Sequence, residues 1–127
     1  MKKLIFVIAL VAFLFMGLGC ASLAPSLTPS QFNNKLPNET KADFYDSLTG
    51  NKAVSNGNCK LLVKGRKYVA PIGFTVNNDL KNGAKGIDEW VQADGGNAYI
   101  LNSFEWVSVD DNGSTQLIIY FDTLLCE

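Results

Sequence analysis

The dipeptide Asn112-Gly113 lies between two strand-like segments and constrains the fold of this 127-residue chain more than any other feature. A two-residue hairpin turn needs positive φ at both central residues, and Asn-Gly is the pair that favours it most strongly. The flanking segments, residues 97–109 and 114–126, are rich in aromatic and β-branched residues, which favour strands. The sequence therefore predicts a C-terminal β-hairpin in which Asp111 lies opposite Ser114.

A turn of two residues also fixes the pairing along the hairpin. It places Trp106 opposite Ile119 and Phe104 opposite Phe121, and cross-strand pairs of this kind stabilise a sheet. We expect this face to pack beneath a helix. The other face is also apolar and is expected to be covered by the N-terminal segment, a partner or another copy; it carries Tyr99, Leu101, Val107, Ile118, Tyr120 and Leu124.

The clearest helix follows apolar residues spaced at intervals of four, four, three and four, namely Val76, Leu80, Ala84, Ile87 and Val91. Asn77 or Asn78 is expected to cap its start, and Gly95-Gly96 is expected to end it. Two internal glycines, Gly83 and Gly86, each cost up to about 1 kcal/mol relative to alanine. We therefore expect them to permit close packing against the sheet.

The remaining elements are shorter. Spacing predicts a helix over 39–48, and an apolar run predicts a strand over 59–64 that restarts or continues after Gly65 over 66–70. Together the elements predict an α+β domain over 38–127, with one main helix packed on a small antiparallel β-sheet that includes the C-terminal β-hairpin. Residues 20–37 are rich in Ser, Pro, Thr and Asn, which predicts a flexible tether.

The first nineteen residues have the pattern of an export signal. Lys2 and Lys3 precede an unbroken apolar run of twelve residues from Leu4 to Phe15, and small residues then lead to Cys20. A transmembrane helix needs about 20 apolar residues. The run is shorter than this, which favours a signal peptide over 1–19 and a mature protein that works outside the cytoplasm.

The end of this signal resembles the lipobox of bacterial lipoproteins, in which a small residue precedes a cysteine that receives the lipid. Gly19 fits the small position, although Gly17 stands where the lipobox has leucine. We predict a lipid on Cys20, and Ala21 after it resembles an outer-membrane destination facing the periplasm. The alternative is cleavage after Ala21, which would discard Cys20.

The other two cysteines, Cys59 and Cys126, allow one pairing only. In an oxidising compartment a disulfide is the expected state, and it would contribute about 4 kcal/mol in the chain-entropy model. Two free buried thiols are the alternative.

The composition narrows the classes of function. The chain has no histidine, which removes the commonest general base and zinc ligand. Without Lys2 and Lys3 it has 9 basic and 12 acidic residues, a net charge of −3, which argues against nucleic acid as a partner. We expect no enzyme activity, no metal and no cofactor.

Two sets of side chains are candidates for contacts. Aromatic and apolar residues on the helix and hairpin could form a protein-contact patch: Trp90, Tyr99, Leu101 and Tyr120. Basic residues around the first turn could contact anionic lipid head groups or simply protect a strand edge: Lys60, Lys64, Arg66 and Lys67.

Three short segments carry a resemblance to a known family: Asp79-Leu80-Lys81-Asn82-Gly83-Ala84, Gly95-Gly96-Asn97-Ala98-Tyr99-Ile100 and Leu125-Cys126. Over residues 58–127 the chain resembles small periplasmic lipoproteins related to the outer-membrane sensor of the Rcs envelope-stress pathway, and an uncharacterised lipoprotein family of similar size. The sensor resembles a two-disulfide domain on a longer tether, whereas one pair of cysteines is present here.

The resemblance implies an envelope lipoprotein without enzymatic activity. It would be anchored in the membrane by lipid and act through contact with an envelope protein, in stress sensing or envelope assembly. The alternative is a periplasmic module that binds a small molecule or an envelope polymer in a pocket near the second face of the hairpin.

Overall fold

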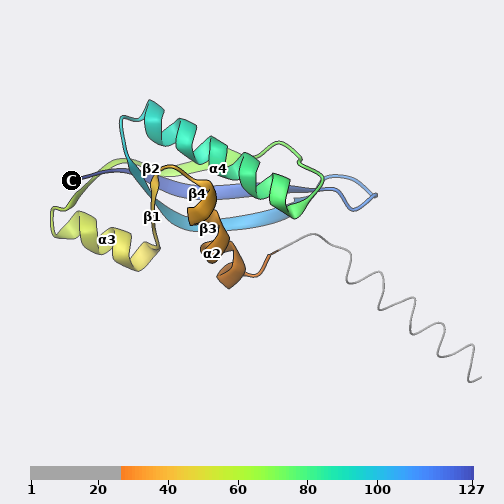
Figure 1. Ribbon diagram of the computed structural model, residues 1–127, viewed down its shortest axis with the longest axis horizontal. Coiled ribbons are helices and arrows are strands. Elements are labelled where there is room, and N and C mark those ends of the chain that lie inside the picture. Colours follow the sequence, from red (N-terminus) through yellow and green to blue (C-terminus); the bar gives the residue numbers. More distant parts are fainter. Residues whose placement is uncertain (1–26) are drawn as a thin grey trace, which may run out of the picture.

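The computed structural model describes residues 27–127, in which four strands form one mixed sheet in the order β1-β3-β4-β2 (Figure 1). The strands are β1 (Asp43–Tyr45), β2 (Cys59–Val69), β3 (Ala98–Ser108) and β4 (Thr115–Cys126). β1 runs parallel to β3, while β4 is antiparallel to both β3 and β2. The predicted α+β class and the C-terminal hairpin are confirmed, but the sheet is mixed rather than antiparallel.

Within residues 27–127, three helices pack on this sheet: α2 (Pro29–Glu39), α3 (Ser47–Ser55) and α4 (Val76–Ala93). The predicted helix over 39–48 is wrong, because its middle forms β1. Asp46 explains the local break: its side chain accepts a hydrogen bond from the backbone N–H of Thr49 and so caps α3, which begins one residue later.

The segment predicted as a flexible tether is ordered from Pro29 onward. Thr28 and Gln31 form a reciprocal capping box, and Pro29 occupies the first turn, where its missing N–H has no cost. Phe32 and Leu36 lie four residues apart and are fully buried. The boundary at residue 38 is therefore wrong, while residues 1–26, with the expected signal peptide and Cys20, lie outside the described residues.

The main helix follows its predicted apolar stripe. Thr75 caps its start by accepting a hydrogen bond from Asn78 N, so the cap lies two residues before Asn77 and three before Asn78, the caps we expected. At its end Gly95 has φ +81, its N–H bonds Gln92 O and the next N–H, of Gly96, bonds Val91 O, which is the Schellman arrangement. The predicted end at these glycines is confirmed.

The two glycines inside α4 lie against the sheet as expected. A Cβ atom on Gly83 would come within 2.7 Å of Ile119 Cδ1, and one on Gly86 would overlap the Tyr68 ring. The glycines thus let the helix backbone approach β4 and β2 more closely than alanine would allow.

The hairpin pairs in a different register from the one predicted. Trp106 lies opposite Leu117 and Phe104 opposite Ile119. The loop has four residues, 110–113, because Asp110 Oδ1 accepts hydrogen bonds from the N–H groups of Asn112 and Ser114. Only Gly113 of the Asn-Gly pair takes positive φ, at +83. A side chain outside the dipeptide therefore selected the longer turn.

Two irregularities, one in β3 and one in β2, lie at the same position along the length of the sheet. β3 shifts register between Leu101 and Ser103, and β2 shifts on both sides of Val63, with Gly65 at φ +76. Asp122 on β4 holds both sites, since its Oδ1 accepts hydrogen bonds from Gly65 N at 2.8 Å and Asn102 Nδ2 at 2.9 Å. This carboxylate is 5% exposed.

The two faces of the sheet are covered to different extents. The first face carries Leu117, Ile119 and Phe121 and shares one core with α4 and α2. Here the ring of Phe32 stacks on the ring of Phe104, with 3.8 Å between their centres. α3 packs on the second face, against Ile100 and Leu124, beside the disulfide. In Figure 1, α3 and the C-terminus lie at one end of the molecule and the hairpin turn at the other. The second face is thus covered by a helix at the disulfide end.

Candidate functional site

The disulfide is formed between Cys59 and Cys126, which lie directly opposite each other on β2 and β4. This confirms the predicted pairing. It joins the first residue of β2 to the last residue of β4, so the two strands are covalently held at the end covered by α3.

Two residues of the predicted contact patch belong to the core. Tyr99 is fully buried and Leu101 is 7% exposed, so neither contributes to a surface. The register shift at Asn102 is the reason, because residues of β3 before it face α4 with odd numbers and residues after it face α4 with even numbers. Burial raises the pKa of Tyr99, whose hydroxyl pairs with Thr40 Oγ1 at 3.1 Å.

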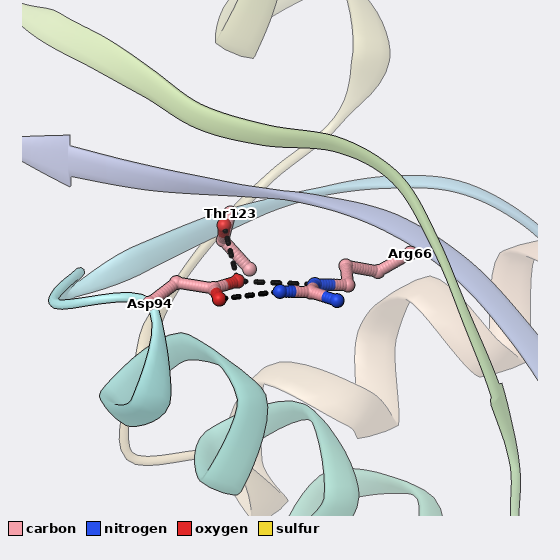
Figure 2. A network of polar contacts seen from close by, with 3 residues as sticks. All are labelled: Arg66, Asp94 and Thr123. Carbon is pink, nitrogen blue, oxygen red and sulfur yellow. Dashed lines mark hydrogen bonds and ion pairs between the residues drawn. The ribbon is translucent and has the colours of Figure 1, made fainter.

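The other aromatic candidate on the helix, Trp90, forms part of a polar network. The Arg66 guanidinium carbon lies 3.9 Å from the centre of the Trp90 ring. Arg66 Nη2 and Nε donate to the two Asp94 oxygens at 2.5 and 3.1 Å, and Thr123 Oγ1 donates to Asp94 at 2.8 Å (Figure 2). The hydrogen bonds from Arg66 hold the pKa of Asp94 below its usual range.

This network joins β2, the end of α4 and β4. Arg66 also offsets the unfavourable position of Asp94 at the negative end of the helix dipole. Arg66 Nε and Nη2 are engaged by Asp94 and the guanidinium lies over Trp90, so contact of Arg66 with head groups stays a prediction.

The three lysines of the predicted basic cluster are exposed but do not form one patch. Lys60 lies opposite Leu125 near the disulfide, while Lys67 lies opposite Tyr120 toward the other end of β2. Seven residues of strand separate these two lysines by about 20 Å. Strand β2 is an edge of the sheet, and lysines at an edge protect it from pairing with other strands.

The structure instead brings together a set of residues on the second face of the sheet, at the hairpin end. They alternate outward along three neighbouring strands, and we call them the open sheet face: Lys67, Val69, Glu105, Val107, Ile118 and Tyr120. Val69 is 43% exposed and Val107 38%, while Ile118 and Tyr120 are half-buried.

A short polar network orders the middle of this face. The Tyr120 hydroxyl donates to Glu105 Oε1 at 2.9 Å, and Lys67 Nζ lies 6.0 Å from the centre of the Tyr120 ring. The hydrogen bond to Glu105 raises the pKa of Tyr120 above its usual range. The aromatic ring is thus held between a carboxylate on β3 and an ammonium group on β2.

Sequence reasoning found Tyr120 but missed Glu105 and Val69. Their orientation depends on the shifts at Asn102 and near Gly65, both held by Asp122, and no local pattern in the sequence marks the shift at Asn102. Gly65 between two strand-like runs was the one available signal, since an isolated glycine in a strand indicates a bulge.

A separate hollow of about 490 Å³ lies where α2, α3 and β3 meet. Its walls mix apolar and polar side chains: Leu27, Pro29, Asn33, Asp46, Ser47, Leu101, Asn102, Ser103 and Phe104. Among residues 27–127, no cluster of three or more His, Cys, Asp or Glu could hold a metal ion. No helix in the same range is both long and apolar enough to span a bilayer.

Comparison of the chain with known protein families, characterised proteins and solved structures finds no match.

Proposed function

We propose that this protein is a non-enzymatic lipoprotein of the bacterial envelope that acts by contact with a protein, and that the open sheet face is the contact surface. The observation that carries the proposal is the unequal covering of the sheet. Antiparallel strands with a solvated face normally place polar residues there. Here Val69, Val107, Ile118 and Tyr120 share the face with Lys67 and Glu105, so apolar side chains are left at its centre and edges without a covering helix.

The chemistry of this face suits a protein partner. Tyrosine and branched apolar side chains supply contact area at low entropic cost, and charged residues at the margin give orientation. Lys67 and Glu105 stand at opposite margins, one on each outer strand of the face. The family resemblance noted above adds stress sensing or envelope assembly as the process served.

The short connection to the anchor supports action near a membrane. Thr28, the cap of α2, follows Cys20 by eight positions, and this stretch can span at most about 28 Å when extended. A lipid on Cys20 would therefore keep the domain close to the outer membrane, on its periplasmic side. The triacylated cysteine of lipoproteins provides the several chains that stable anchoring needs.

Mass spectrometry of membrane-extracted protein tests the anchor. We expect a mature chain that begins at Cys20 and carries the mass of the acyl groups. A mature chain that begins at Ser22 would contradict the lipoprotein assignment.

Site-specific photocrosslinking tests the contact surface. A photoreactive residue at Val69 should give protein adducts in the native envelope, whereas the same residue at Leu125 should give few. Both side chains are 43% exposed, but Leu125 lies on the other face at the disulfide end, so exposure alone cannot explain a difference. Equal yields at the two positions would contradict a contact role for the open sheet face.

The hollow between α2, α3 and β3 favours a second candidate, a module that binds a small molecule or a polymer segment. Its volume lies within the range of about 300–1,000 Å³ found for ligand sites. Replacing Ser103, which lines the hollow, by tryptophan would narrow it. The Ser103→Trp variant would favour the binding module if it lost the cellular function of the unchanged protein while photocrosslinking from Val69 to other proteins stayed the same.

A further inference from the structure

We infer that the partner seated on the open sheet face is a second copy of this chain. The inference rests on the proposed function, because it names the partner of the same surface. Its basis is the order of charge across three strands: Lys67 on β2, the Ile118 and Tyr120 side chains on β4, and Glu105 on β3. Positive and negative margins thus lie on either side of an aromatic and apolar centre.

This order is self-complementary under a two-fold rotation. Two sheets that pack face to face lie about 10 Å apart, with neighbouring strands about 4.8 Å apart within each sheet. Rotation about a line along β4 in the contact plane places β2 of one copy over β3 of the other. Val69 of one copy then lies directly over Glu105 of the other and Lys67 lies over Ser103, so Lys67 approaches Glu105 diagonally. β4 packs on β4, and each contact between two different residues occurs twice.

The positions of the two charged residues along their strands permit this pairing. Lys67 lies at the level of Tyr120, and Glu105 lies at the level of Ile118, two residues farther along β4. This offset is about 7 Å, and the four-carbon stem of lysine together with the glutamate side chain can cover it. Both side chains are exposed, and Glu105 can keep the hydrogen bond from Tyr120 on Oε1 while Oε2 accepts from Lys67 of the second copy.

A second copy satisfies both margins at once. A partner with one sign of charge would attract either Lys67 or Glu105 and repel the other, and like charges brought together suppress binding. At the centre, Tyr120 and Ile118 of the two copies would exclude water. Val69 of each copy would pack against the side chain of Glu105 of the other, and Val107 would lie two residues farther toward the hairpin turn.

The face is small, which makes the expected dimer weak in solution. Three strands, each about five residues long, present a face of about 250 Å². A standard interface buries about 800 Å² on each partner, which is far more. Anchoring both copies to one membrane raises their effective concentration, as a linker does between two binding modules. The dimer should therefore form at the membrane and dissociate on extraction at low concentration.

Charge reversal in the full-length, membrane-bound protein tests the inference, with the photoreactive residue at Val69 as reporter. Lys67→Glu alone and Glu105→Lys alone should each lower the adduct of twice the chain mass by fivefold or more, because each creates two like-charge contacts. The double variant should restore the yield to within twofold of the unchanged protein. The Cys59–Cys126 disulfide and the circular dichroism spectrum verify that each variant is folded.

The alternatives give distinct results. Adducts at Val69 with other masses only would overturn the inference and leave the proposed contact function standing. Equal adduct yields at Val69 and Leu125 would overturn both. Single reversals without effect, or a double variant that stays as weak as the singles, would overturn the two-fold pairing of Lys67 with Glu105.

Discussion

Replacing Asp122 by alanine removes the one acceptor shared by the two irregular sites of the sheet. Its carboxylate is 5% exposed and accepts from Gly65 N and Asn102 Nδ2. Two hydrogen bonds to a charged group contribute about 3–6 kcal/mol, and alanine avoids part of the cost of burying the charge. We therefore expect the free energy of unfolding to fall by about 2–4 kcal/mol.

Urea unfolding followed by tryptophan fluorescence measures this loss. Asp122→Asn is the matched control, because its amide oxygen can still accept both hydrogen bonds, and it should lose less than half as much. A double-mutant cycle with Asn102→Ala should give a coupling energy of about 0.5–3 kcal/mol.

A loss below about 1 kcal/mol for the alanine variant would refute the claim that Asp122 holds the two sites, since buried hydrogen bonds to a carboxylate contribute more than this. Equal losses for alanine and asparagine would also refute it. The Asp122→Ala variant should in addition lower photocrosslinking at Val69, because the shift near Gly65 sets the orientation of that side chain.

Three further predictions concern stability. Joint replacement of Cys59 and Cys126 by serine opens a loop with a sequence separation of 67 and should lower the free energy of unfolding by about 4 kcal/mol; a loss below about 2 kcal/mol in urea would contradict the loop-entropy account. Phe74 has φ +65 and is 83% exposed, so Phe74→Gly should raise the melting temperature by relieving up to about 1 kcal/mol of backbone strain, and a decrease would show that the ring makes stabilising contacts. Arg66 lowers the pKa of Asp94 in the folded protein. The ionised Asp94 therefore stabilises the fold above its unfolded pKa of about 3.9, and this stabilisation is lost as pH falls through the lower folded pKa. The stability difference between the unchanged protein and Asp94→Asn should thus shrink below about pH 4, and a constant difference down to pH 2 would contradict this pairing.

Local patterns predicted some elements well. The apolar stripe of α4 and its glycine end follow from the helical period and from the backbone freedom of Gly95, which depend on neighbouring residues only. The segment from Pro29 to Leu36 shows the limit of composition. Its proline, serine and asparagines suggest a tether, yet Thr28 and Pro29 are the residues that start a helix, and Phe32 and Leu36 give it an apolar side to bury.

The hairpin shows how a side chain next to the turn and a register shift farther along the strand together change an interpretation. Asn112-Gly113 marks a turn, but Asp110 extends the loop, and the shift at Asn102 then turns Tyr99 and Leu101 into the core. A shift of one residue moves a strand's side chains to the opposite face of the sheet. The predicted contact patch was therefore half wrong, although every residue in it was identified as apolar or aromatic.

By itself the sequence determined the α+β class, the main helix, the existence of the hairpin and the Cys59–Cys126 pair, which is the single pairing that two cysteines allow. The tertiary structure alone decided the register, the parallel position of β1, the packing of α2 and the residues of the open sheet face. These depend on contacts between residues far apart in the chain: the burial of Phe32 and Leu36 against the sheet, the pairing of β1 with β3, and the hydrogen bonds that Gly65 and Asn102 donate to Asp122. Such contacts leave no periodic pattern in the sequence, because each joins a single pair of distant positions.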